Sequence, residues 1–192
     1  SPISGLQAES TGGLGVAAPD TVAICGSETV TFTATDGLSH IFRIDGNPVG
    51  ARSDNFRLVT NTLIDGQTVT VESFSTDTAT GGGCSSISPG ITMSVGANPI
   101  VSLTSTAFPS SVSSSTFCDG EAITFTATST SGISTYTFMV GGVSQKTGPS
   151  NTFSPPAFSS TVSVAVRVET AGGCTATDTL DLFYNDIDVT GT

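Results

Sequence analysis

A segment of twelve residues occurs twice in this chain, and the repeat constrains the fold more than any other feature. The first copy runs from Ile24 to Thr35 (ICGSETVTFTAT) and the second from Phe117 to Thr128 (FCDGEAITFTAT). Each copy holds a cysteine, a glutamate and the letters TFTAT at the same places, 93 positions apart and without a gap. Such an internal repeat predicts that the chain consists of two similar units.

The length of the chain agrees with two units. Its 192 residues provide about 95 for each unit, which is a normal size for an all-β sandwich. We expect one unit over residues 1–96 and the other over residues 97–192. Because the connection over residues 95–98 is short, we also expect the two units to lie end to end.

The TFTAT segments have the alternation of a half-buried strand. In the first copy Val30, Phe32 and Ala34 alternate with threonines, and in the second copy Ile123 and Phe125 begin the same pattern, which Ala127 completes. Successive side chains of a strand point to opposite faces of a sheet, so the apolar set is predicted to face the core.

Turn signals divide each unit into about seven short strands. The Ser/Thr/Gly-rich residues 9–19 and 104–116 are expected to be loops, and no segment has the period of a helix. Short strands with a turn signal every 8–12 residues are typical of an immunoglobulin-like sandwich. The predicted fold class is therefore all-β, with two tandem immunoglobulin-like β-sandwich domains.

Composition and charge exclude some functions. The net charge is −11 and only five residues are basic, which argues against nucleic-acid binding because that requires a basic surface. No run of apolar residues is long enough to insert into a membrane. Four cysteines, two in each unit and without a CxxC pair, favour disulfides over a metal site and indicate an oxidising, extracellular location. Because the chain begins at Ser1, we expect it to be a processed or excised piece of a longer protein.

The pattern of cysteines, glycines and strands resembles a known group of repeats. It consists of Cys25 to Thr35 followed by Gly83-Cys84, and of Cys118 to Thr128 followed by Gly173-Cys174. It is similar to the Ig-like or PKD-like tandem repeats of large secreted surface proteins in Bacteroidetes-type bacteria, which include gliding-motility adhesins and proteins exported by the type IX secretion system. The resemblance covers nearly the whole chain.

This resemblance implies a function without catalysis. The chain would be a structural and adhesive repeat module of a long cell-surface adhesin of the gliding-motility kind, forming a disulfide-stabilised rod. Its partners would be neighbouring repeats of the same chain, and a surface polysaccharide or another cell surface. The alternative is an accessory spacer or carbohydrate-binding region of a secreted hydrolase. A third hypothesis is an extender that depends on Ca²⁺.

Strand directions favour one of two possible disulfide patterns. Cys25 precedes the TFTAT strand and Cys84 follows a later strand, so counting alternate strand directions places them at opposite ends of the domain, about 26 Å apart. A disulfide requires Cα atoms within about 7 Å. We therefore favour an inter-domain bond between Cys25 and Cys174, which leaves Cys84 and Cys118 for neighbouring repeats. The other pattern is Cys25–Cys84 with Cys118–Cys174.

Other polar residues offer weaker candidates for a site. His40 is the only histidine, so a Ser-His-Asp arrangement has no support, and we expect it to be packed or at an edge. Pairs of carboxylates are weak candidates for Ca²⁺ ligands, although no DxDxDG loop is present; these are Asp119, Glu121, Asp186 and Asp188. The resemblance also implies O-glycosylation at Asp-Thr-apolar motifs, with Thr21, Thr78 and Thr179 as the acceptors.

Overall fold

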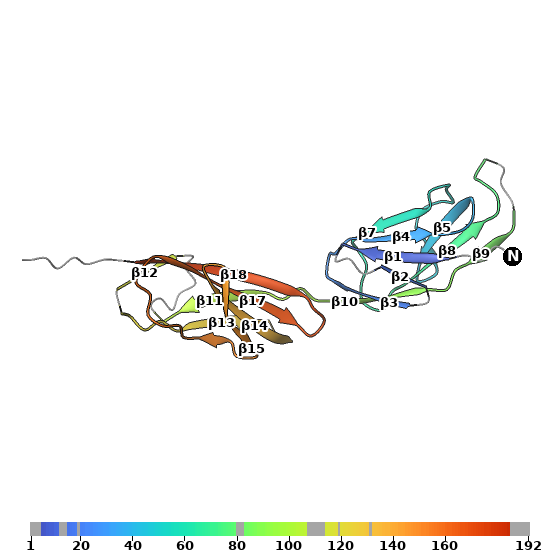
Figure 1. Cartoon of the computed structure of the whole chain (residues 1–192). Helices are drawn as coiled ribbons and strands as arrows, with labels where there is room; N and C mark the ends of the chain where they lie inside the picture. The colour runs from blue at the N-terminus through green and yellow to red at the C-terminus, as the bar shows by residue number, and fades with distance from the viewer. Residues whose placement is uncertain are drawn as a thin grey trace, which may run out of the picture. The chain divides into compact units, whose positions relative to one another are not determined.

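The computed structural model shows a chain made of β-strands that divides into two compact units. It describes residues 5–11, 15–18, 20–79, 83–106, 114–118, 120–130 and 132–184. Unit 1 is Ser1–Ala97 and unit 2 is Asn98–Thr192 (Figure 1). No helix among the described residues is long and apolar enough to cross a membrane.

Unit 1 has two sheets. The first has the strand order β2-β1-β4-β7 and the second has the order β3-β10-β8-β5-β6, with β9 also paired to β8. The strands are β1 (Leu6–Ser10), β2 (Gly15–Ala17), β3 (Asp20–Cys25), β4 (Val30–Ala34), β5 (Ser39–Ile44), β6 (Asn47–Pro48), β7 (Arg57–Thr60), β8 (Thr68–Phe74), β9 (Ser85–Ile87) and β10 (Ile91–Gly96).

The two sheets of unit 1 pack face to face over one core. Val30 and Phe32 of β4 are fully buried, and the same cluster contains Val69 and Val71 of β8 and Ile91 of β10. In Figure 1, β1, β4 and β7 form one layer of the unit, and β3 and β10 lie in the other. Burial of apolar surface between two sheets is what holds a β-sandwich together.

Unit 2 repeats this plan with fewer strands described. One sheet has the order β11-β13-β16 and the other has the order β12-β18-β17-β14-β15. The strands are β11 (Val101–Ser105), β12 (Ser114–Phe117), β13 (Phe125–Ser129), β14 (Ile133–Val140), β15 (Val143–Gly148), β16 (Thr152–Phe153), β17 (Val162–Thr170) and β18 (Thr175–Tyr184).

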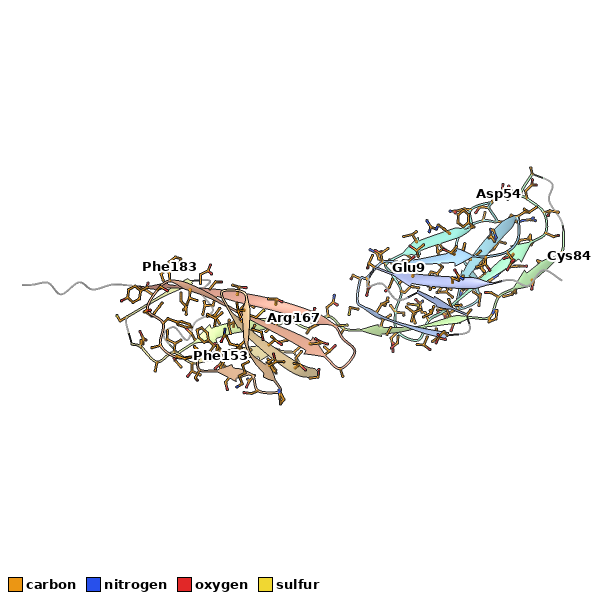
Figure 2. The ribbon with its side chains drawn as sticks, in the orientation of Figure 1. Glu9, Asp54, Cys84, Phe153, Arg167 and Phe183 are labelled. Atoms are coloured by element: carbon orange, nitrogen blue, oxygen red, sulfur yellow. The ribbon has the colours of Figure 1, made fainter. Side chains whose placement is uncertain are left out.

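Aromatic rings fill much of the core of unit 2. Phe125 of β13 and Phe138 of β14 are fully buried on opposite sheets, and each ring stacks on Phe153, at centroid distances of 6.3 and 5.4 Å. Figure 2 labels Phe153 in unit 2. Phe117 lies edge-on to Phe158 and Tyr184. Offset and edge-on pairs of this kind add to the energy of burial alone.

The alternation predicted for the TFTAT strands is confirmed. Along β4 the residues are buried and half-buried in turn, and Val30, Phe32 and Ala34 are the buried ones. In unit 2 the corresponding Ile123, Phe125 and Ala127 are buried. The all-β class and the tandem sandwich architecture are therefore correct.

The loops expected over residues 9–19 and 104–116 contain strands, so that prediction is wrong in part. Residues 15–17 form β2 and residues 114–117 form β12. β2 (Gly-Val-Ala) is too short, and β12 (Ser-Ser-Thr-Phe) too polar, to show the apolar alternation by which a strand is recognised. The strand that leads into each cysteine, β3 or β12, runs parallel to the last strand of its unit, β10 or β18.

Candidate functional site

Cys25 and Cys118 each begin the same tight turn, which we call the Cys-Glu turn (residues 25–28 and 118–121). In unit 1 the backbone N–H of Glu28 donates to the carbonyl of Cys25 at 3.0 Å, and the N–H of Cys25 donates to Glu28 Oε2 at 3.1 Å. In unit 2 Glu121 makes the same two bonds with Cys118, both at 3.3 Å. The glutamate therefore fixes the backbone of the cysteine in both units.

The third residue of the Cys-Glu turn has a left-handed backbone. Ser27 has φ +68° and Gly120 has φ +72°. A positive φ at the third position, with a hydrogen bond from the fourth residue to the first, is characteristic of a type II turn. The two copies therefore share this positive φ and this hydrogen bond as well as a sequence pattern.

Cys84 and Cys174 lie in a second shared arrangement, the Gly-Cys turn, in which a hydroxyl residue at the end of a strand holds a Gly-Cys pair. In unit 1 the N–H of Ser75 donates to the Cys84 carbonyl at 3.0 Å, and the N–H of Cys84 donates to Ser75 Oγ at 3.1 Å. In unit 2 Thr170 makes both bonds with Cys174, at 2.9 and 3.1 Å. The glycine before each cysteine has φ +85°.

Arg52 supports the longer of these two turns. Cys84 follows Ser75 by nine positions in the sequence, whereas Cys174 follows Thr170 by four. The Arg52 guanidinium lies 4.0 Å from the centre of the Phe74 ring, and its Nη2 donates to the carbonyl of Thr76 at 2.6 Å. Figure 2 labels Cys84 at one end of unit 1, where the loop after β8 leads into β9. A stacked and hydrogen-bonded arginine thus holds the residues at the end of β8, from which the chain continues to Cys84.

The two cysteines of unit 1 lie at opposite ends of one sheet. Cys25 of β3 is level with Gly96 of β10, and β10 pairs with β8 through Ile91 and Val69. The backbone of Cys84 is hydrogen-bonded to Ser75, which lies just beyond the other end of β8. Counting along these registers, about 11 residues or roughly 36 Å of strand separate the two positions. A Cys25–Cys84 bond would need them within about 7 Å.

Unit 2 separates its two cysteines in the same way. Cys174 directly precedes β18, and Cys118 directly follows β12. Because β12 runs parallel to β18 and pairs Phe117 with Tyr184, Cys118 lies level with the far end of β18. The separation is again about 11 residues, roughly 36 Å. In both units the sheet itself keeps the two cysteines apart.

The four cysteines are in two chemical states. Cys25 and Cys174 are disulfide-bonded, whereas Cys84 and Cys118 are free and exposed. Each kind of turn therefore occurs once with a disulfide-bonded cysteine and once with a free cysteine. That Cys25 and Cys174 are bonded to each other stays a prediction from the strand directions.

The three threonines predicted as glycan acceptors are all exposed. The aspartates before Thr21 and Thr179 each accept the backbone N–H of that threonine, at 2.7 and 2.9 Å. The hydroxyl of Thr78 instead donates to Asp54 Oδ2 at 3.1 Å, so glycosylation of Thr78 would break this hydrogen bond. Glycosylation of these residues stays a prediction.

The remaining candidates are not brought together into a site. Asp119, Asp186 and Asp188 lie outside the described residues. Glu121 is occupied in the Cys-Glu turn. No group of three or more His, Cys, Asp or Glu side chains able to hold a metal occurs in the described part of the chain. His40 is buried, as expected of a packed residue, and its Nε2 lies 2.9 Å from the Asp36 carbonyl.

Comparison with known proteins gives likenesses to solved structures alone. No family model matches the chain, and no curated protein matches it. Fibronectin(III)-like modules of Clostridium thermocellum CbhA match 96% of this chain and 97% of theirs, at 14% identity and a TM-score of 0.46. Rst D1-D2 matches over 93% of this chain and 100% of its own, at 9% identity and a TM-score of 0.40.

A third likeness is to the N-terminal four Ig domains of Dscam1 isoform 6.9, at 12% identity and a TM-score of 0.39. The match covers 86% of this chain but only 43% of the Dscam1 chain. The fold class stands on the strand orders and cores described above.

Replacing Gly120 by alanine tests the turn geometry. An added Cβ would meet no atom within 4 Å, so the cost comes from the left-handed backbone alone. We expect Gly120→Ala to lower the free energy of unfolding of unit 2 by about 1 kcal/mol. Ser27→Ala is the matched control, expected to change unit 1 by less than about 0.5 kcal/mol because Ser27 already carries a Cβ. Amide hydrogen exchange, followed separately in each unit, measures both; equal effects would contradict the shared turn.

Proposed function

We propose that this chain is a non-catalytic structural repeat module of a long, secreted cell-surface adhesin. In this proposal, a disulfide between Cys25 and Cys174 joins consecutive sandwich domains into a rod that holds adhesive parts of the protein away from the cell. The bond would run from the Cys-Glu turn of one domain to the Gly-Cys turn of the next.

One observation carries the proposal. Each unit fixes one cysteine at each end of the same sheet, in turns that the other unit reproduces bond for bond. A disulfide inside a sandwich would stabilise that sandwich alone, and the roughly 36 Å between the two positions argues against such a bond. Cysteines held at opposite ends suit a module that is linked on both sides.

The extracellular location rests on chemistry and composition. Disulfides persist in oxidising compartments and are rare in the cytosol. With a net charge of −11 and 11% charged residues, the surface is polar and acidic, consisting largely of Ser, Thr and Gly. The adhesin role, and its connection with gliding motility and type IX secretion, rest on the resemblance of the cysteine and TFTAT pattern. Such a module would have neighbouring repeats as partners, and a polysaccharide or another cell as its target.

Carbohydrate binding by the sheet faces is the less favoured function. The large exposed aromatic residues in the described parts are Phe56 and Phe183, which belong to different units and form no stacking platform. A cavity of about 340 Å³ lies over β1, β2 and β4, and no aromatic ring lines it. Its lining residues are Gln7, Ala8, Glu9, Val16, Ala17, Thr31 and Thr33.

Tryptic mapping without reduction tests the proposed bond sharply, because the chain has only five basic residues. Cleavage after them leaves Cys25 in peptide 1–43, Cys84 and Cys118 together in peptide 58–146, and Cys174 in peptide 168–192. We expect peptides 1–43 and 168–192 to be recovered as one disulfide-linked species. Peptide 58–146 should be recovered separately, with two thiols that react with iodoacetamide.

The alternative pattern gives a different map. With Cys25–Cys84 and Cys118–Cys174, all three peptides would be joined into one species, and no thiol would react. Recovery of that species would overturn the proposal. A fully reduced and realkylated sample serves as the control, because it must give three separate peptides in either case.

Surface exposure tests the cellular part of the proposal. Antibodies raised against the folded chain should label intact cells that produce the protein, since a rod on the cell surface is accessible without permeabilisation. Labelling should also disappear after brief treatment of intact cells with an external protease. Labelling only after permeabilisation would contradict the proposed location.

A further inference from the structure

We infer that Cys84 and Cys118 are complementary covalent docking ends, each of which forms a disulfide with a further copy of the same kind of domain. Cys118 would bond the Gly-Cys turn of a domain that follows, and Cys84 would bond the Cys-Glu turn of a domain that precedes. The inference rests on the proposed function, and it names the partner and the two atoms through which the partner is joined.

The first argument comes from the state of the equivalent residues. Cys118 is the equivalent of Cys25, and Cys84 is the equivalent of Cys174. Both equivalents, Cys25 and Cys174, are disulfide-bonded. The free members are exposed, which leaves their sulfur atoms accessible to a partner. Each kind of cysteine is thus already seen in the bonded state that we assign to its free equivalent.

The second argument is the matched geometry. Glu121 holds the backbone of Cys118 through the same two bonds that Glu28 makes to Cys25. Ser75 holds Cys84 as Thr170 holds Cys174, although the loops between them differ in length. A free cysteine without a bonding role has no need of a backbone setting that reproduces that of a bonded cysteine, with a positive φ residue in each turn.

The two kinds of turn are complementary, so the contact is head to tail. In the proposed Cys25–Cys174 bond, a Cys-Glu turn meets a Gly-Cys turn. Cys118 should therefore form a disulfide with the Cys84 of another copy in preference to its Cys118. Cys84 should likewise prefer a Cys118 to another Cys84. Head-to-tail contacts of this kind leave a free end after every addition and produce open chains rather than closed dimers.

The chemistry needs a disulfide oxidant, which in the experiment is oxidised glutathione. The thiolate of Cys118 attacks one glutathione sulfur and releases one reduced glutathione. The thiolate of Cys84 from a second copy then attacks the Cys118 sulfur of this mixed disulfide and releases the second reduced glutathione. Two cysteine thiols lose two electrons and two protons, and the glutathione disulfide gains them.

The test uses two single variants of the full chain. Cys84→Ser keeps only the Cys118 thiol, and Cys118→Ser keeps only the Cys84 thiol. One variant is labelled with ¹⁵N, because the two singly substituted 58–146 peptides otherwise have the same mass. The two are mixed in equal amounts in a glutathione redox buffer, the dimers are isolated by non-reducing electrophoresis, and the linked tryptic peptides are identified by mass. We expect the mixed Cys84–Cys118 dimer to exceed either homodimer about tenfold, as a modest specific contact would produce. The unsubstituted chain should form a ladder of dimers, trimers and longer species.

A displaced thiol provides the matched control. Cys84→Ser/Cys118→Ser/Ala51→Cys carries one thiol at Ala51, which is an exposed position of unit 1 outside the two turns. Mixed with the Cys84→Ser variant, it should show no preference for the mixed dimer. A statistical ratio in the main experiment, with the mixed dimer at only twice the amount of either homodimer, would overturn the inference. A tenfold excess in the control would also overturn it.

Failure of this inference is distinguishable from failure of the proposed function. The same tryptic digests report whether peptides 1–43 and 168–192 are linked in each variant. If that link is present and the mixed dimer shows no excess, the bond between domains stands and the docking ends do not. If the link is absent, the proposed function itself fails.

Discussion

The length of a β-strand is the constraint on which the rest of this structure depends. A sheet that spans the sandwich keeps the cysteine before the TFTAT strand roughly 36 Å from the cysteine that ends the Gly-Cys turn. No rotamer or loop adjustment closes such a gap while the strands between them remain paired. Each sandwich must therefore be stabilised by its own core, without a disulfide between its two cysteines. The fully buried Phe32 and Phe125 show that both cores are well formed without a disulfide inside them.

The hydrogen bonds around the cysteines explain why such a short motif is repeated so closely. A disulfide requires defined separations of Cα and Cβ atoms, so both backbones must be held in position before the sulfur atoms meet. The glutamate three residues after Cys25 or Cys118 supplies this control on one side, and a strand-terminal hydroxyl supplies it on the other. Position 28 or 121 is therefore a structural glutamate rather than one more surface charge.

The sequence predicted the two sandwiches well because a period of two is a strong signal wherever one sheet face is buried. It did not predict β2, which has only three residues, or β12, whose residues are mostly polar, because neither shows such a period. In unit 1, Ser88 lies between β9 and β10 and makes two hydrogen bonds with Val71, one of them through its side-chain hydroxyl, so the final strand is interrupted. In unit 2 the equivalent strand, β18, is continuous from Thr175 to Tyr184. The sequence did not indicate that Ser75 and Thr170 hydrogen-bond to Cys84 and Cys174. These residues precede their cysteines by nine and four positions, so no fixed spacing marks the pair. Opposite placement of the two cysteines, by contrast, followed from counting strand directions.

Pulling a single oxidised chain from its two ends tests the central claim most directly. A bond between Cys25 and Cys174 shields the residues between them from force, so only about 43 of the residues extend, giving roughly 150 Å of unfolded chain. After reduction the full 192 residues should extend, to about 650 Å. An extension of about 260 Å in the oxidised chain is what disulfides inside each unit would give, and it would contradict the account.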